Sequence, residues 1–292
     1  GCVARHHVTL FSALMKSGKS TLVGHLIRAL QDGSPFAGWQ TQKCRTLVVT
    51  EESQAIWRSR RDALGLDDSL AVMCRPMVVK PTFLDWADFL AHVVRCAARR
   101  FDLVVIDTLS AFAPWENENS AADVQATLTP LNQLTDAGLA VLAIHHIGKI
   151  DGSEGRAARG STALAAGVDI LLELRRYRPD DRQDRRRVLS GLGRFDEVPD
   201  ELVIALAEDG SGYTAEGDRK GLAARELCQL ILDVLPPDPP GWSTDEVHEG
   251  MPKHNRPRRG EVGKALQTGA EAGSWRMAGA GKPNDPRRFW KK

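Results

Sequence analysis

Six consecutive residues near the start of the chain have the types and spacing of a phosphate-binding loop. Backbone N–H groups of such a loop, and of the helix that follows it, point at an anion, and the helix dipole adds positive potential there. In this pattern Lys19 reaches the β- and γ-phosphates of a nucleotide, and the Ser20 hydroxyl binds Mg²⁺. The predicted nucleotide contacts are Lys16, Ser17, Gly18, Lys19, Ser20 and Thr21.

The residues on either side of this loop predict the elements that must position it. Residues 8–11 are a short apolar run of β type, and from Leu22 to Leu30 apolar residues recur at the spacing of one helix face. A phosphate-binding loop requires this order of strand, loop and helix. Ala13 stands where the consensus G-x-x-x-x-G-K-[ST] has its first Gly, and Ala fits there unless the position needs a positive φ. The alternative is a chance Gly-Lys-Ser in a surface turn.

Three further apolar runs end in polar side chains. The runs at 46–50, 101–106 and 139–144 are followed by Glu51, by Asp107 and by the pair His145 and His146. Runs without polar alternation, separated by helical segments, predict an α/β fold with a mostly parallel sheet and helices on both faces. Ligands of such sheets lie beyond the carboxyl ends of the strands, so we expect these side chains to converge on the loop. The His pair does not predict zinc, because no Cys or further His stands at ligand spacing.

The composition is that of a globular protein from a reducing compartment. The chain has 292 residues, is 42% hydrophobic and 26% charged, and has no apolar run of membrane-spanning length. Five scattered cysteines without C-x-x-C pairing predict reduced thiols and no structural zinc. No signal-peptide pattern stands at the start. We therefore expect a cytoplasmic protein that does not contact a membrane.

Charge is unevenly distributed along the chain. The net charge is +1, but residues 251–292 hold eleven Lys or Arg and three Asp or Glu, a net of +8, against −7 for residues 1–250. A basic end on an acidic body indicates contact with a polyanion, with a solvated basic surface as the alternative.

Residues 222–292 predict a second domain. Three helical patterns are followed by a hairpin made from residues 275–278 and 287–290, which is the order of a small winged-helix domain. Its third helix and hairpin would hold basic side chains suited to contact with DNA phosphates, foremost Arg258 and Arg259, and also Lys264, Arg276, Lys282, Arg287 and Arg288. A protein-interaction domain that binds a replication partner is the open alternative. The predicted division is a core at 1–207, a linker at 208–221 and a basic winged-helix-like domain at 222–292.

Four pieces of the sequence resemble the RecA-type ATPases of the hexameric helicase branch. They are KSGKST, VVTEES, LVVIDTLSAF, and AIHHIGK followed by ARGSTALAAGVDILLEL. The chain is most similar to the plasmid RepA-like group, which also resembles the motor domain of DnaB. The last piece is the most specific, because a double His followed by Arg-Gly-Ser-Thr-Ala is not a general feature of phosphate-binding loops. The resemblance covers residues 1–207 and implies a RecA-like fold that binds ATP and Mg²⁺.

The resemblance also implies roles for the side chains at the strand ends. Glu51 would orient and activate the attacking water, with Glu52 as a local competitor and capping of the next helix as the alternative role. Asp107 would hold the Mg²⁺ shell together with Ser20. His146 would sense the γ-phosphate, whereas His145 is the candidate for a hydrogen-bonded core residue.

Basic residues beyond the His pair are implied to act on DNA and on a neighbouring subunit. Residues 147–159 match the mobile loop that touches single-stranded DNA, with a flexible loop of incidental charge as the alternative. Arg194 follows the predicted strand at 187–192, where such ATPases place an arginine finger that reaches the neighbour's nucleotide; Arg175 and Arg176 are alternatives. The implied DNA contacts of the loop are Lys149, Arg156 and Arg159.

Taken together, these expectations describe an Mg²⁺-dependent ATPase that assembles as a ring, a hexamer in this branch. It would act on single-stranded DNA as a helicase or translocase in the replication of a mobile element. The alternative is an ATP-gated DNA-binding or regulatory module without unwinding activity. A small-molecule kinase is disfavoured, because no lid-like arginine segment is evident.

Overall fold

The computed structural model describes residues 2–147, 162–282 and 284–292. The chain forms two compact units, Gly1–Glu216 and Gly217–Lys292. Within the described ranges we find no helix whose length and apolar character would let it span a bilayer. Lys149, Arg156 and Arg159 lie outside the described residues.

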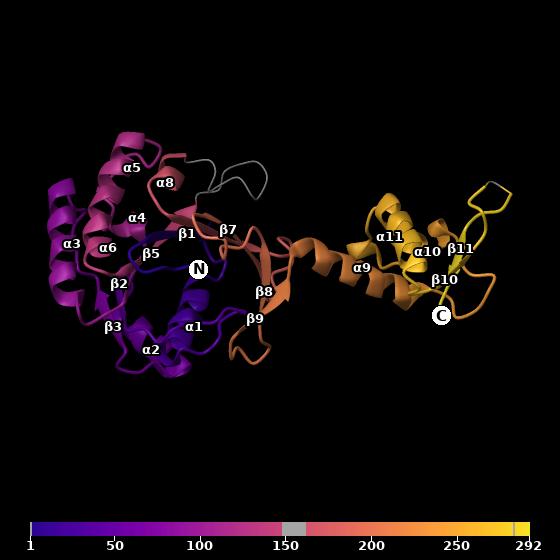
Figure 1. Ribbon diagram of the computed structural model, residues 1–292, viewed down its shortest axis with the longest axis horizontal. Coiled ribbons are helices and arrows are strands. Elements are labelled where there is room, and N and C mark those ends of the chain that lie inside the picture. The colour runs from indigo at the N-terminus through magenta and orange to yellow at the C-terminus, as the bar shows by residue number, and fades with distance from the viewer. Residues whose placement is uncertain (1, 148–161, 283) are drawn as a thin grey trace. The chain divides into compact units, whose positions relative to one another are not determined.

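Unit 1 is built on one sheet of nine strands, in the order β3-β2-β4-β5-β1-β6-β7-β8-β9 (Figure 1). The strands from β3 to β6 in this order are parallel, whereas β7 and β8 are antiparallel to their neighbours. The strands are β1 (Val8–Leu14), β2 (Thr46–Thr50), β3 (Leu70–Cys74), β4 (Leu103–Asp107), β5 (Ala140–Ile147), β6 (Ile170–Arg176), β7 (Arg186–Gly193), β8 (Leu202–Leu206) and β9 (Tyr213–Gly217).

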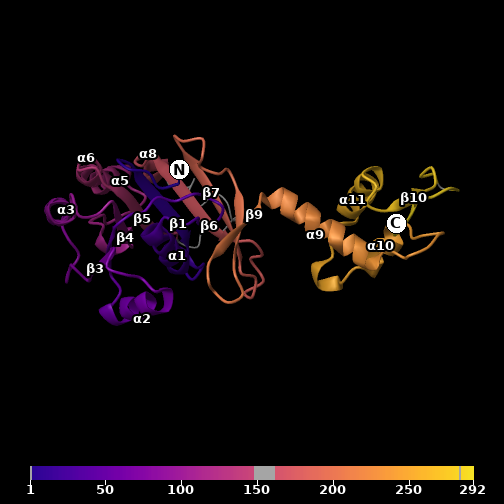
Figure 2. The same ribbon diagram turned by 60° about the horizontal axis from the view of Figure 1, so that its bottom comes forward.

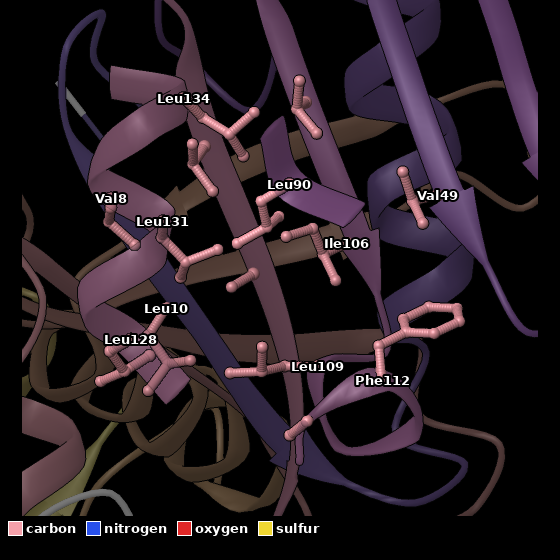
Figure 3. Packing of buried hydrophobic residues seen from close by; sticks show 14 of the residues in the cluster. Val8, Leu10, Val49, Leu90, Ile106, Leu109, Phe112, Leu128, Leu131 and Leu134 are labelled. Carbon is pink, nitrogen blue, oxygen red and sulfur yellow. The ribbon is translucent and has the colours of Figure 1, made fainter. Parts of the chain in front are cut away.

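Helices cover both faces of this sheet, as Figure 2 shows, so the expected mostly parallel α/β architecture is confirmed. Side chains alternate across each strand, and the two sets pack into two separate cores. Val8, Leu10 and Ile106 face α3, α5 and α6 (Figure 3), whereas Phe11 and Val105 face α1 and α2. The helices of unit 1 are α1 (Lys19–Asp32), α2 (Gln54–Leu64), α3 (Phe83–Ala97), α4 (Leu109–Phe112), α5 (Ala121–Leu128), η1 (Thr129–Leu131), α6 (Asn132–Asp136) and α8 (Thr162–Ala166).

Helix ends follow from local sequence. Thr82 begins α3 with a reciprocal capping box, in which its hydroxyl accepts from the Asp85 N–H and the Asp85 carboxylate accepts from the Thr82 N–H. The sequence after residue 120 predicts one helix that continues to about 134–137, where Gly138 would end it. The structure instead has three short helices there, α5, η1 and α6. Pro130, which lacks an N–H and clashes with a continuing helix, lies at the break.

Two other expectations differ from the structure. Residues 71–79 are mostly apolar and precede Pro81, which predicts a strand over this range. The strand ends instead at Cys74, because Arg75 adopts a left-handed φ of 52°. The segment 208–221, expected to be a linker, contains β9, the last strand of the sheet, and the start of α9. Gly and charged residues there form the turn that leads into β9 rather than a free linker.

Unit 2 has its own apolar core. Trp275 is buried, its indole N–H donates to the Leu266 carbonyl at 2.7 Å, and its ring lies against Gly269, where a Cβ would stand 2.1 Å from a ring atom. Trp242 and Phe289 exchange two backbone hydrogen bonds of 2.9 and 2.8 Å. The elements are α9 (Arg219–Val234), α10 (Thr244–Gly250), η2 (Lys253–Asn255), α11 (Arg259–Glu271), β10 (Arg276–Ala278) and β11 (Arg288–Trp290).

Candidate nucleotide-binding site

The loop between β1 and α1 has the backbone of an anion cradle. Gly18 adopts a left-handed φ of 100° immediately before α1, and Lys16 also has a positive φ, of 59°. These turns direct consecutive N–H groups toward one point at the helix N-terminus. Ala13 lies within β1, fully buried and without a positive φ, so it takes the place of the consensus Gly without strain. The hydroxyl of Ser17 is buried and has no hydrogen-bond partner within the described residues.

Lys19 lies at the centre of this loop and is 5% exposed. Its ammonium donates to the carbonyls of Ala13 and Leu14, at 2.9 and 3.1 Å, and contacts His146 Nδ1 at 2.8 Å. Burial lowers the pKa of Lys19 to about 8, and the nearby Asp107 carboxylate partly offsets that effect. Because an ammonium only donates, Nδ1 of His146 must accept, which leaves that imidazole neutral with its proton on Nε2.

Two adjacent glutamates follow β2, and the fold separates their roles. Glu51 Oε2 accepts from both the N–H and the hydroxyl of Thr108, at 3.1 and 2.9 Å, which fixes this carboxylate beside the end of β4. Glu52 instead forms a two-pronged ion pair with Arg60 of α2, at 2.7 and 3.2 Å. Glu51 is exposed, so its second oxygen can meet a water or substrate. Thr108, which orients Glu51, was not predicted, because only the sheet brings the two residues together.

Asp107 ends β4 and is 6% exposed. Burial, and then the charges of Glu52 and Glu51, raise its pKa to about 6, while Arg60 and Lys19 act in the opposite direction. A divalent cation beside the carboxylate would reverse this penalty, and carboxylate and hydroxyl oxygens are ligands that Mg²⁺ prefers. Among the described residues, no three His, Cys, Asp or Glu side chains are grouped to hold a metal by themselves. The site therefore fits an ion that keeps waters and phosphate oxygens as ligands, with Asp107 and Ser20 as the protein's contribution.

The two histidines at the end of β5 have different surroundings. His145 is buried; its Nδ1 lies 3.2 Å from the Ser110 hydroxyl, and its ring packs edge-on against Trp115. Burial, followed by the influence of His146 and Lys19, lowers its pKa to about 4. His146 faces the phosphate-binding loop through its contact with Lys19, and burial and Lys19 lower its pKa as well. The geometry places His145 in the core and His146 in the candidate site.

The burial of neutral His145 predicts a pH dependence of folding. Between pH 6.5 and 4 the unfolded chain binds a proton at this position and the folded chain does not, so stability is full above 6.5 and falls toward pH 4. The loss should be about 3 kcal/mol. His145→Asn, which keeps a polar atom near Ser110, should flatten this part of the curve in chemical denaturation at pH 7.5, 5.5 and 4.5. The exposed His92 supplies the control, and His92→Asn should follow the wild-type curve; an equal flattening in both variants contradicts the assignment.

Two arginines from β6 and β7 also contact the phosphate-binding loop. Arg187 Nε donates to the Ser17 carbonyl at 2.7 Å, and Arg176 Nη2 donates to the Lys16 carbonyl at 3.2 Å. The two residues are register partners in the β6–β7 pair. Burial and the neighbouring Arg176 lower the pKa of Arg187. Arg187 was not predicted as a site residue. In the sequence it is one of several arginines in a charged stretch, and its contact with the loop depends on the pairing of β7 with β6, which the sequence does not indicate.

Loss of the Arg187 contact should weaken nucleotide binding. Arg187→Ala removes a hydrogen bond between a guanidinium and the loop backbone, of the kind that contributes about 1.5–3 kcal/mol, so the Kd for ATP should rise about tenfold or more. Arg187→Lys should recover part of the loss, because an ammonium can still donate to Ser17. Titration with a fluorescent ATP analogue tests this, with the exposed Arg182→Ala of the same hairpin as the matched control. Binding unchanged by Arg187→Ala would refute a role in positioning the loop.

Arg194 lies far from this loop in the same chain. It follows β7 at the end where Gly193 pairs with Ile170, and its Nε is 3.7 Å from Asp169 Oδ1. Because β6 is parallel to β1, this is the amino-end edge of the sheet, opposite the phosphate-binding loop. The side chain is 76% exposed. Arg194 therefore cannot reach the phosphate-binding loop of its own chain, because the length of the strand separates them. A role of Arg194 at the nucleotide of a neighbouring subunit stays a prediction.

In unit 2, Arg258 precedes α11 and is exposed. Arg259 is engaged by both carboxylate oxygens of Asp245, one of them at 3.0 Å. The predicted DNA contact of Arg259 would have to compete with this ion pair. The predicted nucleotide contacts, Glu51, Asp107 and His146 therefore gather at one edge of the sheet in unit 1, whereas Arg258 and Arg259 belong to unit 2.

Comparison with known proteins agrees with this geometry. The profile of a protein family described as an AAA domain matches residues 1–152 of the 292. The chain belongs to this family. Residues 1–152 of this AAA-domain protein include the loop, Glu51, Asp107 and both histidines, and the family supports ATP binding and hydrolysis.

Among solved structures, the AAA-domain protein is similar to one described as the crystal structure of the RadB recombinase. The TM-score is 0.50 and the identity 17%, and the match covers 73% of this chain and 91% of that chain. At this identity the likeness shows the fold alone, and it confirms the predicted RecA-like α/β fold. No curated protein matches the sequence.

Proposed function

We propose that this AAA-domain protein is an Mg²⁺-dependent ATPase that assembles as a ring and acts on single-stranded DNA as a helicase or translocase. The observation that carries the proposal is the convergence of four polar side chains at the carboxyl ends of adjacent strands. Lys19 follows β1, and Glu51, Asp107 and His146 stand at the ends of β2, β4 and β5, in the sheet order β2-β4-β5-β1. Nucleotides bind at this position in open α/β sheets.

The contacts of these side chains support a different role for each of them in ATP hydrolysis. The N–H groups of residues 17–21 and the Lys19 ammonium bind the phosphates. Glu51, held by Thr108, orients the attacking water and accepts its proton. Asp107 and Ser20 hold Mg²⁺, which, when bound, neutralises charge on the phosphates. Glu52 is paired with Arg60 and is therefore the weaker candidate for the base.

The contact between Lys19 and His146 supports a role for His146 as the sensor. Lys19 uses its three donors on Ala13, Leu14 and His146. When phosphates draw the ammonium away, His146 Nδ1 loses its donor and becomes free to accept another. Since residues 147–159 follow directly, a change at His146 would pass to the segment in which we propose that Lys149, Arg156 and Arg159 contact single-stranded DNA.

Assembly is supported by the exposure of Arg194 at the edge of the sheet opposite its own loop. Arg194 is 76% exposed and lies 3.7 Å from Asp169, so it is accessible to a neighbouring subunit, where it would neutralise charge in the transition state. The structure described as a recombinase shares the fold. A replication role and a hexamer follow from the resemblance to the RepA-like group and stay proposals.

The test combines ATPase rates with and without single-stranded DNA, fork unwinding, and molecular mass in solution. The proposal expects Mg²⁺-dependent hydrolysis that single-stranded DNA stimulates, unwinding of a fork with ATP, and an ATP-dependent increase in mass. Hydrolysis without stimulation or unwinding, together with ATP-dependent duplex binding, would instead support the ATP-gated DNA-binding module. The absence of hydrolysis under all conditions would refute both.

A further inference from the structure

Unit 2 is divided into an acidic and a basic half. Residues 217–250 hold three Lys or Arg and seven Asp or Glu, a net of −4, whereas residues 251–292 have a net of +8. The acidic half contains α9 and α10, and the basic half contains α11 and the β10–β11 hairpin. Opposite charges at this density attract across a small domain, and the acidic half neutralises only part of the basic side chains.

Some basic side chains are engaged within the unit. Arg259 is bound by Asp245, and Arg288 lies 3.5 Å from Glu246 and donates to the Gly241 carbonyl at 3.0 Å. Arg256 donates to the carbonyls of Glu249 and Met251, at 2.8 and 2.9 Å. These contacts join the two halves of the unit and have a structural role.

Other basic side chains form no ion pair with any residue in the described part of the chain. Arg276 and Lys282 of the hairpin are exposed, as is Lys264 on α11. Arg287 is also exposed, and its Nη1 donates to Gln267 Oε1 of α11 at 2.8 Å. Its guanidinium lies beside Gly281, whose left-handed φ is 76°. The hairpin and α11 are thereby joined into one surface that carries unneutralised cations.

The chemistry of this surface favours a polyanion over a protein partner. Protein interfaces are anchored by apolar and aromatic side chains in their centre. Within the described residues of unit 2, Met277 is the one exposed large hydrophobic side chain, at 38%. The three acids of residues 251–292, Glu261, Glu271 and Asp285, accept hydrogen bonds from backbone N–H groups or an amide side chain, not from these cations. Exposed cations in excess of acids and without an apolar centre are typical of surfaces that contact phosphates.

The burial of the aromatic side chains in unit 2 favours duplex over single-stranded nucleic acid as the ligand. Single-stranded binders stack bases on exposed aromatic rings. In unit 2, Trp275 and Phe289 are buried in the core, and Trp242 and Trp290 are half-buried around the same strands. A protruding hairpin beside a helix of thirteen residues instead fits the backbone and grooves of a double helix.

We propose that the β10–β11 hairpin and the exposed face of α11 bind duplex DNA, with phosphate contacts from Arg276, Lys282 and Arg287. This surface is a second nucleic-acid site of the chain, and it does not depend on the phosphate-binding loop. Among the basic side chains predicted to contact DNA, Arg259 is held by Asp245, whereas these three hairpin cations form no ion pair within the described residues.

The experiment measures binding of the full chain to a fluorescent 20-base-pair duplex between 50 and 300 mM salt, without nucleotide. The slope of log K against log salt is negative, and each lost phosphate contact reduces its magnitude by about 0.9, so Arg276→Ala/Lys282→Ala should reduce the magnitude by about 1.8. Affinity at the lowest salt should fall by about tenfold or more. Arg276→Lys/Lys282→Arg, which preserves charge, should restore the wild-type slope.

The matched control removes one Arg and one Lys from the acidic half of the same unit. Arg219→Ala/Lys220→Ala changes net charge equally and should leave the slope unchanged; thermal unfolding verifies that both variants fold. Equal slopes for the two variants, or duplex binding by Arg276→Ala/Lys282→Ala at the wild-type level, would overturn the proposal and leave a protein partner. A larger loss for a single-stranded 20-mer than for the duplex would overturn it too. Because no nucleotide is present, neither result bears on the ATPase proposal.

Discussion

Glu51→Gln should lower the rate of ATP hydrolysis at saturating ATP by about 10²–10⁴-fold while leaving ATP binding within about threefold of wild type, as expected for the loss of a general base. The amide keeps the size of the side chain and one oxygen that can accept from Thr108, so the loop and the end of β4 stay in place. It removes the carboxylate that accepts a proton from the attacking water. Single-turnover hydrolysis, measured beside equilibrium binding of a fluorescent ATP analogue, separates the two effects.

The neighbouring glutamate provides the control for this prediction. Glu52→Gln alters a carboxylate of the same type one position away, but one that is bound to Arg60. We expect it to reduce hydrolysis much less than Glu51→Gln does. Wild-type hydrolysis by Glu51→Gln, or a larger loss in Glu52→Gln, would show that the base has been assigned to the wrong residue.

Lys19→Met should weaken ATP binding by about 10²-fold and abolish measurable turnover. The ammonium is the one buried cation among the described residues of the loop, and charge-assisted hydrogen bonds to phosphate contribute about 1.5–3 kcal/mol each. Methionine fills the space of the aliphatic chain without the charge, so the fold should persist. Isothermal titration with ATP and Mg²⁺ measures the loss, and the exposed Lys43→Met controls for the removal of a positive charge elsewhere.

A second readout tests the contact with His146 directly. Burial and, after it, the charge of Lys19 lower the pKa of His146 in the free protein, so in Lys19→Met the pKa of His146 should rise. Titration of the imidazole by NMR measures this shift. An unchanged pKa of His146 in Lys19→Met would contradict the proposed contact between Lys19 and the sensor. An ATP affinity of Lys19→Met within about threefold of wild type would show that Lys19 does not bind the phosphates.

The main elements of the fold follow from local sequence. Apolar runs such as 101–106 and helix signals such as Thr82 and Gly33 act over a few residues, so they predict strands and helix ends without knowledge of the rest of the chain. The differences arise where one residue overrides a pattern. Pro130 breaks a helix whose apolar periodicity continues, and Arg75 ends a strand predicted to continue to Val79.

The sequence by itself determined the phosphate-binding loop, the α/β class and the polar residues at the strand ends, because each depends on residues adjacent in the chain. Only the tertiary structure distinguished Glu51 from Glu52, through Thr108, which is 57 residues away, and brought Arg187 to Ser17 across 170 residues. Such contacts depend on strand order and register, which no local propensity encodes. The same holds in unit 2, where the contact with Asp245 distinguishes Arg259 from the hairpin cations proposed to bind DNA, which form no ion pair within the described residues.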